Sequence, residues 1–435
     1  MSEAKAKFPA ANEDKRTPIS EHPPTLVKTH RPQPSRSSSK QTIKDDITQN
    51  PKWGSLPPQV KFYLKYHRNN LSHHHYAWKY DGGDFLKKTF LEIAINFEPL
   101  LYAVVAFAAF HNALSREDGR IKDFLDSYNK SVSLLRQSLA KSDRHSLSTL
   151  LTILQLATIE EFLGDWVNLL SHQRAAHQII TDLFTPQTIT QSETHRKIIS
   201  WYIRFDLFAG MMGGGKTVLG REWFAACADF YKRQARDKPE ELGARFEEYF
   251  ATSRLIATDI AILLASKTAQ QISDKDFAQE VASILAQMEV LGTELQNAFT
   301  DSSCFVKTFP NAPPPSESDI TDFRDPNFCY AGDYFTMNYV RIDFWAIELM
   351  FRYQLSMAQP NQPPPPILQE LALKKCKMLE AVQYCNQGPP GAILGTQASL
   401  GIASLFLPKD QKHTDWCRRK FALMEQLGYE RSIRL

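Results

Sequence analysis

Apolar residues recur every three or four positions through most of this chain, and this spacing constrains the fold more than any other feature. Three segments show the pattern most clearly, at 121–139, 246–264 and 277–295. Such a period places one apolar stripe along a helix, whereas a half-buried strand alternates with a period of two. No comparable run of alternation is present. We therefore predict an all-α, multi-helix fold.

Glycine usage and hydropathy agree with a helical core. The chain has 18 Gly among 435 residues, fewer than the roughly 7% of average proteins, and tight strand turns need more left-handed positions than helices do. The apolar stretch 100–110 is shorter than the ~20 residues that span a bilayer, so we expect no transmembrane helix. The charged, proline-containing N-terminus also lacks the apolar core of a secretory signal.

Six cysteines are spread through the chain, and no two have C-x-x-C spacing. Six thiols in so long a chain do not form a disulfide framework, so a reducing compartment, cytosol or nucleus, is expected.

The first 52 residues differ from the rest in composition. They are rich in Pro, Ser, Thr, Lys and Arg, and residues 1–44 hold nine Lys/Arg against four Asp/Glu. Such a segment buries too little apolar surface to fold, so we predict a disordered basic tail at 1–52 and one helical domain at 53–435. The tail is either a solvated segment or an arm that contacts nucleic acid or an import receptor. Residues 45–435 hold 42 basic and 44 acidic residues, and therefore no net positive charge to attract nucleic acid.

Two clusters of proline interrupt the helical pattern. Pro310 and 313–315 separate the central helices from a C-terminal set, and 363–366 divide that set. Several successive prolines remove too many backbone donors for a kinked helix, so both clusters are predicted to be surface loops.

The string from Gly210 to Thr217, Gly-Met-Met-Gly-Gly-Gly-Lys-Thr, formally matches the phosphate-binding loop G-x-x-x-x-G-K-[ST]. That loop requires a buried strand before it, but apolar residues in 198–208 have helical spacing. No apolar run ending in Asp offers the second magnesium site. We therefore interpret the glycines as a connection between helices. The alternative is a P-loop NTPase or other enzyme that uses Gly215, Lys216 and Thr217.

Three other groups have chemistry-bearing side chains but a simpler interpretation. His67 with His73–His75 lacks a cysteine or carboxylate partner set for a metal, and we expect a surface loop. Glu160, Glu161 and Asp165 are interpreted as solvated charges near a helix end. The aromatic residues between 330 and 345 either line a pocket or pack in the core, and we prefer the core: Tyr330, Tyr334, Phe335, Tyr339, Phe344 and Trp345. We assign no catalytic, cofactor-binding or metal-binding residue.

Three segments resemble a known family. The first is Glu161-Phe-Leu-Gly-Asp-Trp166 followed by His172 and Ala175-Ala176, and the second is Arg204-Phe-Asp206. The third runs from Gly391 through Leu405-Phe-Leu-Pro-Lys-Asp410 to Trp416, Lys420 and Leu427-Gly-Tyr429. Together they resemble the fungal-specific transcription factor domain, from about Leu56 to the C-terminus. The resemblance implies an all-helical regulatory domain that usually follows a zinc binuclear cluster.

The cysteine positions of this chain differ from those of the family. The family's DNA-binding cluster uses six closely spaced N-terminal cysteines, whereas the first cysteine of this chain is Cys227. The resemblance therefore implies a nuclear transcription regulator, not an enzyme, that acts through protein partners, including a second copy of the chain as a homodimer, or through a small-molecule effector. We expect no membrane association and weak or no direct DNA binding. A helical scaffold without any ligand remains a further alternative.

Overall fold

The computed structural model describes residues 47–116, 121–141, 145–213, 217–357, 363–389 and 391–427. Within these ranges the chain forms fourteen α-helices and no β-strand, and its one isolated β-bridge pairs Phe305 with Tyr330. The predicted all-α fold is confirmed. Most of the tail predicted at 1–52 lies outside the described residues, but Ile47 is buried in the core. The folded body therefore begins at least six residues before the predicted boundary.

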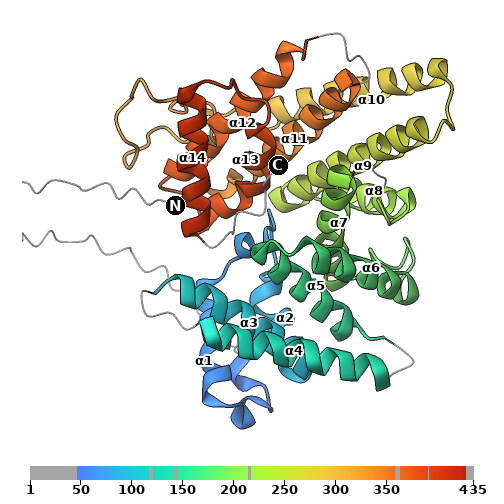
Figure 1. Ribbon diagram of the computed structural model, residues 1–435, viewed down its shortest axis with the longest axis vertical. Coiled ribbons are helices and arrows are strands. Elements are labelled where there is room, and N and C mark those ends of the chain that lie inside the picture. Colours follow the sequence, from blue (N-terminus) through green and yellow to red (C-terminus); the bar gives the residue numbers. More distant parts are fainter. Residues whose placement is uncertain are drawn as a thin grey trace, which may run out of the picture. The chain divides into compact units, whose positions relative to one another are not determined.

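The N-terminal half of the body is organised around one apolar helix, which packs against four neighbours, α1, α2, α4 and α5 (Figure 1). That helix is α3, and its sequence is apolar on every side because it is covered on every side. The helices of this half are α1 (Pro58–Asn70), α2 (Thr89–Asn96), α3 (Glu98–Leu114), α4 (Ile121–Lys141), α5 (Leu147–Leu163), α6 (Trp166–Leu183) and α7 (Glu193–Gly213).

The C-terminal half is organised around a long helix, α9, which packs against α7, α8, α10 and α11. The helices of this half are α8 (Arg221–Asp237), α9 (Leu242–Thr268), α10 (Asp274–Asn297), α11 (Thr336–Met357), α12 (Pro366–Tyr384), α13 (Gln397–Ser404) and α14 (Gln411–Gln426). Short 3-10 helices connect them: η1 (Ile47–Gln49), η2 (Trp53–Ser55), η3 (His73–Tyr76), η4 (Phe85–Lys87), η5 (Ser302–Cys304), η6 (Gly332–Tyr334) and η7 (Ala392–Thr396).

By length and composition, α9 is also the one helix among the described residues that would suffice to cross a membrane. Half of its most apolar window is buried inside the body. It also contains Glu247 and Asp259, which form ion pairs with Lys197 and Arg221. These are the surroundings of a core helix in a folded body.

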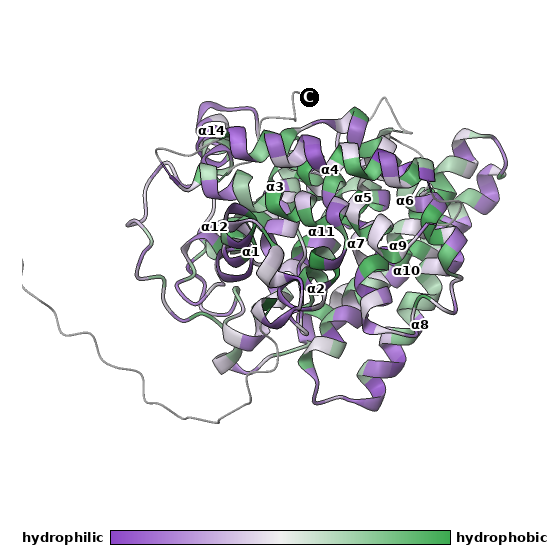
Figure 2. Ribbon diagram, turned by 90° about the horizontal axis from the view of Figure 1, so that it is seen from below, coloured by the Kyte–Doolittle hydropathy of each residue, from purple (hydrophilic) through white to green (hydrophobic). Residues whose placement is uncertain are grey.

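One continuous apolar core joins both halves and includes side chains from Ile47 to Met424. Figure 2 shows hydrophobic residues concentrated on central helices such as α9 and hydrophilic residues on outer elements such as α14. This distribution explains the apolar stripes in the sequence, because each stripe faces a neighbouring helix.

Two helix boundaries are set by local capping interactions. Gly164 ends α5 with a φ of 69°, and the side chain of Asp165 then accepts the backbone N–H of Asn168 at 3.1 Å to begin α6. Ser273 begins α10 by accepting the backbone N–H of Asp276 at 3.1 Å. Both are the local caps that a helix start or end requires.

Both proline clusters lie outside helix interiors. The segment 298–335, which includes Pro310 and 313–315, is irregular apart from η5 and η6. Asn338 on α11 holds the end of this segment in place. Its side-chain oxygen accepts the backbone N–H of Tyr330, and its side-chain amide donates to the carbonyl of Tyr330, both at 2.9 Å. In the second cluster, Pro366 is the first residue of α12, where a proline is tolerated because its missing N–H has no intrahelical partner.

Candidate functional site

A cavity of about 190 Å³ lies where the two halves of the body meet. Its walls come from α5, α7, α9, α11 and α13, and the segment 77–80 and η7 complete them. Because elements from the whole length of the chain converge here, the cavity exists only in the folded body.

Helices α7 and α9 each present one face to the cavity. From α7 come Lys197, Ser200, Arg204 and Leu207, and from α9 come Glu247, Phe250, Ser253 and Arg254. Intervals of three and four residues put these side chains on one side of each helix. Unlike the core stripes, these faces mix charged and apolar residues.

Helix α11 and the segment after α12 close the opposite wall. They contribute Asp343, Ala346 and Ile347 from α11, and Leu394, Gly395 and Ile402 from η7 and α13. The Tyr339 hydroxyl donates to the carbonyl of Ala392 at 2.6 Å. The backbone at Gly395 approaches Tyr339 closely, because a Cβ there would lie 3.0 Å from Tyr339 Cε1.

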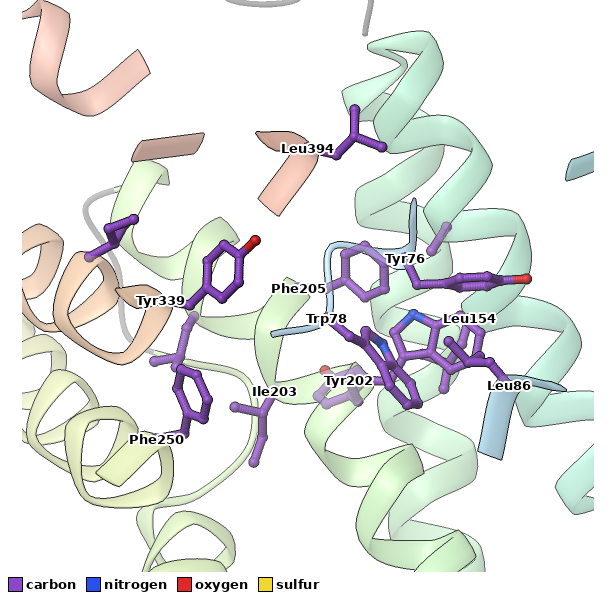
Figure 3. Close-up of a cluster of buried hydrophobic side chains, with 14 of the residues drawn as sticks. Tyr76, Trp78, Leu86, Leu154, Tyr202, Ile203, Phe205, Phe250, Tyr339 and Leu394 are labelled. Atoms are coloured by element: carbon purple, nitrogen blue, oxygen red, sulfur yellow. The ribbon is translucent and has the colours of Figure 1, made fainter. Parts of the chain in front are cut away.

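Figure 3 shows buried hydrophobic side chains beside this region, and three of those that it labels, Trp78, Phe250 and Leu394, line the cavity. Phe250 and Tyr339 lie on one side, Trp78, Leu154 and Tyr202 lie on the other, and Leu394 projects from a separate segment. Trp78 packs edge-on against Trp201 of α7, with ring centroids 5.3 Å apart. The segment 77–80 is thereby anchored, and its left-handed Ala77, with a φ of 51°, sits beside the cavity.

Three carboxylates line the cavity, and each has a cationic partner. Glu161 receives two parallel hydrogen bonds from Arg204, at 2.7 and 2.8 Å. Glu247 lies 3.5 Å from the ammonium of Lys197, which also lies 3.7 Å from Asp81.

The third pair is Asp343 with Lys79, whose Nζ lies 3.9 Å away and also bonds the carbonyl of Gly395. Burial lowers the pKa of Lys79, and the nearby Asp343 opposes that shift. The cavity is thus a partly apolar space with a dense charge lining, the combination that orients a small ligand.

Two further cations lie in or next to this region. Arg254 lines the cavity and, among the described residues, has no carboxylate partner within ion-pair distance. Lys375 on α12 is only 2% exposed, and its ammonium has no hydrogen-bond partner in the described part of the chain. Burial lowers the pKa of Lys375 to about 7.

The described surroundings of the glycine-rich string differ from those of a phosphate-binding loop. Gly215 and Lys216 lie outside the described residues, but the preceding segment is the helix α7 and not a strand. The Thr217 hydroxyl donates to the carbonyl of Leu219 at 2.9 Å. The backbone N–H groups of Val218 and Leu219, which follow the string, donate to the carboxylate of Asp206 at 2.8 and 2.9 Å. Those amides are therefore already occupied by an internal anion.

The histidines are not on a surface loop, so that expectation was wrong. His67 and His74 are each about 1% exposed, and His73–Tyr76 form the 3-10 helix η3. His67 Nε2 pairs with the Tyr76 hydroxyl at 2.5 Å, and the His75 ring packs edge-on against His111. Burial lowers the pKa of His67 to about 3, so this cluster is neutral at pH 7. The polar composition of the histidine run therefore gave no indication that the segment is buried.

The interpretation of Glu160 and Glu161 as solvated charges was also wrong. Glu160 is buried and accepts a hydrogen bond from the Tyr128 hydroxyl. Glu161 lines the cavity and binds Arg204. Only Asp165 has the expected role near a helix end. The signal that could have revealed these sites is a charge placed on an otherwise apolar helix face, as in α5, α7 and α9.

The aromatic group between 330 and 345 is mainly core, as expected: Tyr330, Phe335, Tyr339, Phe344 and Trp345 are buried, and Tyr334 packs against them from a partly exposed position. Across the described ranges, no group of three or more His, Cys, Asp or Glu side chains is placed to hold a metal ion.

Comparison with protein families gives one match. The model described as "Fungal specific transcription factor domain" matches residues 62–434. Neither a curated protein nor a solved structure matches the chain. The family match covers nearly the whole folded body and includes every helix that lines the cavity.

Proposed function

This chain belongs to the fungal-specific transcription factor domain family, and from that premise we propose that it is a regulatory domain controlled by a small molecule bound in the central cavity. The family is one of transcription regulators, which agrees with a nuclear regulator and not with an enzyme. The single observation that carries the proposal is the cavity itself, which has charged and apolar walls at the junction of the two halves of the body.

The position of the cavity supports a regulatory role. Its walls belong to five α-helices that are distant in sequence, so a bound molecule would contact both halves at once. A ligand that binds only the folded arrangement stabilises it by mass action. An effector at this point would therefore favour one packing of the halves over another, which is how a ligand shifts a regulatory equilibrium.

We propose that DNA recognition is not a property of this sequence. The six-cysteine zinc cluster of the family is absent from it, since its first cysteine is Cys227. The regulator would then act through protein partners, including a second copy of the chain. Light scattering of the purified protein distinguishes a monomer from a homodimer.

The effector proposal is tested by thermal unfolding of the purified chain with a panel of small molecules about the size of benzene. A ligand at about a hundredfold its Kd adds about 2.7 kcal/mol of stability, and so raises the melting temperature. The variant Ala346→Phe places a ring in the cavity and should abolish the rise while circular dichroism stays helical. If no molecule raises the melting temperature of the unaltered chain, the chain is a ligand-free scaffold.

A further inference from the structure

We propose that the cavity ligand is a small carboxylic acid with an apolar body, and that Arg254 and Ser253 on α9 bind its carboxylate group. This inference rests on the proposed function of the cavity and adds the chemical class of the ligand.

The first argument is the pairing of charges around the cavity. The lining contains four cations and three carboxylates. Arg204 is paired with Glu161, Lys197 with Glu247, and Lys79 with Asp343. Arg254 is left without a carboxylate partner among the described residues, so it is the one cation of the described lining that no carboxylate pairs with. A ligand with a single negative charge would pair with its guanidinium.

The chemistry of Arg254 favours a carboxylate over other anions of the same charge. Its guanidinium is a planar fork of donors that binds the two oxygens of a carboxylate in parallel. The same cavity already contains that arrangement, because Arg204 binds both oxygens of Glu161. The guanidinium carbon of Arg254 lies 5.5 Å from the ring centroid of Phe250, which also lines the cavity. The positive charge of Arg254 therefore lies next to the apolar wall that Phe250 forms.

The second, independent argument is an unpartnered buried hydroxyl. Ser253 is only 2% exposed, lines the cavity, and its Oγ has no hydrogen-bond partner in the described part of the chain. A buried hydroxyl without a partner is costly and uncommon. An acceptor oxygen in the cavity would satisfy it, and a carboxylate whose other contact is Arg254 supplies such an oxygen.

The volume and the walls of the cavity determine the size and polarity of the ligand apart from its carboxylate. Its volume is about 190 Å³, and an apolar cavity of about 150 Å³ binds benzene. Phe250, Ile347 and Ile402 provide the apolar walls. The ligand would therefore have a body of about one aromatic ring or a short branched chain, with one carboxylate.

The test uses benzoate and its neutral isostere benzamide as probes in titration calorimetry with the full chain. Benzoate should bind the unaltered protein at least about tenfold more tightly than benzamide, because a charged hydrogen bond contributes more than a neutral one. Arg254→Met, which keeps the length and loses the charge, should weaken benzoate about tenfold or more and leave benzamide nearly unchanged. Ser253→Ala should weaken benzoate less. The control Arg418→Met removes an arginine that is exposed on α14 and should change neither affinity.

The outcomes separate this inference from the proposed function. If benzoate and benzamide bind equally and Arg254→Met changes neither, the carboxylate inference is overturned while ligand binding in the cavity stands. Benzoate binding that persists in Ala346→Phe places the probe elsewhere and also overturns the inference. If neither probe binds and the thermal panel gives no rise, both proposals fail. Far-UV circular dichroism and the melting temperature of each variant confirm that it is folded.

Discussion

The carboxylate of Asp206 accepts the backbone N–H of Leu219 at 2.9 Å, and so ties α7 to the chain beyond the glycine-rich string. Its second oxygen accepts the N–H of Val218 at 2.8 Å and the side-chain amide of Gln173 at 2.9 Å. Asp206 is fully buried, and burial raises its pKa. One side chain on a helix therefore organises the connection from α7 to α8.

We predict that Asp206→Asn destabilises the protein by about 1–3 kcal/mol, because the new amide group leaves at least one buried donor unsatisfied. Urea unfolding followed by circular dichroism measures the loss. The control Asp237→Asn changes an exposed carboxylate at the end of α8 and should have an effect close to zero. Equal stability of the two variants would contradict the role given to Asp206.

The same geometry predicts that the chain does not bind nucleotide through Lys216. A phosphate-binding loop needs free backbone amides around the anion, whereas Val218 and Leu219 are bonded to Asp206. Calorimetry with ATP and magnesium should give no binding heat with the unaltered chain or with Lys216→Ala. Micromolar binding that disappears in Lys216→Ala would instead establish a P-loop NTPase.

The helices were predictable from sequence because their signals are local. The stripe at 277–295 and the cap at Ser273 lie within or beside one element, α10. The cavity was not predictable in the same way, because its pairs join distant positions: Arg204 and Glu161 are 43 residues apart. Glu161 looks solvated when only its neighbours in sequence are considered. The burial of His74 depends on Tyr339, a residue of α11 against which its ring packs.

The buried histidines predict that the protein loses stability in acid. Burial lowers the pKa of His67 to about 3 and that of His75 to about 4. In the unfolded chain both have a pKa near 6.5. Between pH 6.5 and 4 the unfolded state therefore binds more protons than the folded state, so stability falls as pH falls. The expected slope is about 1.4 kcal/mol per pH unit for each histidine.

Urea unfolding at pH 7, 6 and 5 measures this slope. His67→Gln should reduce the slope, whatever it does to the stability at pH 7. Stability that is constant from pH 7 to pH 5 would show that these histidines are not held neutral.

DNA binding should be weak and should depend on salt. The nine Lys/Arg of residues 1–44 are the main basic concentration in the chain, and contacts of that kind weaken steeply as salt displaces them from phosphates. We predict no preference among DNA sequences in a mobility-shift assay and loss of binding by ~200 mM salt. Deletion of residues 1–44 should remove the remaining low-salt binding. A defined footprint that survives this salt concentration would refute the prediction.

The last prediction concerns thiol reactivity. The neighbouring Cys329 thiol lowers the pKa of Cys385 to about 7, although partial burial opposes the shift. Burial raises the pKa of Cys417, which is also only partly buried, and raises that of Cys227 to about 12. Since the thiolate is the nucleophile, iodoacetamide at pH 7.5 should modify Cys385 before Cys417, as read by mass spectrometry of peptides. Cys329→Ala removes that neighbouring thiol and should slow the reaction of Cys385 severalfold while Cys417 reacts as before. If Cys417 reacts first in the unaltered protein, Cys329 does not activate Cys385.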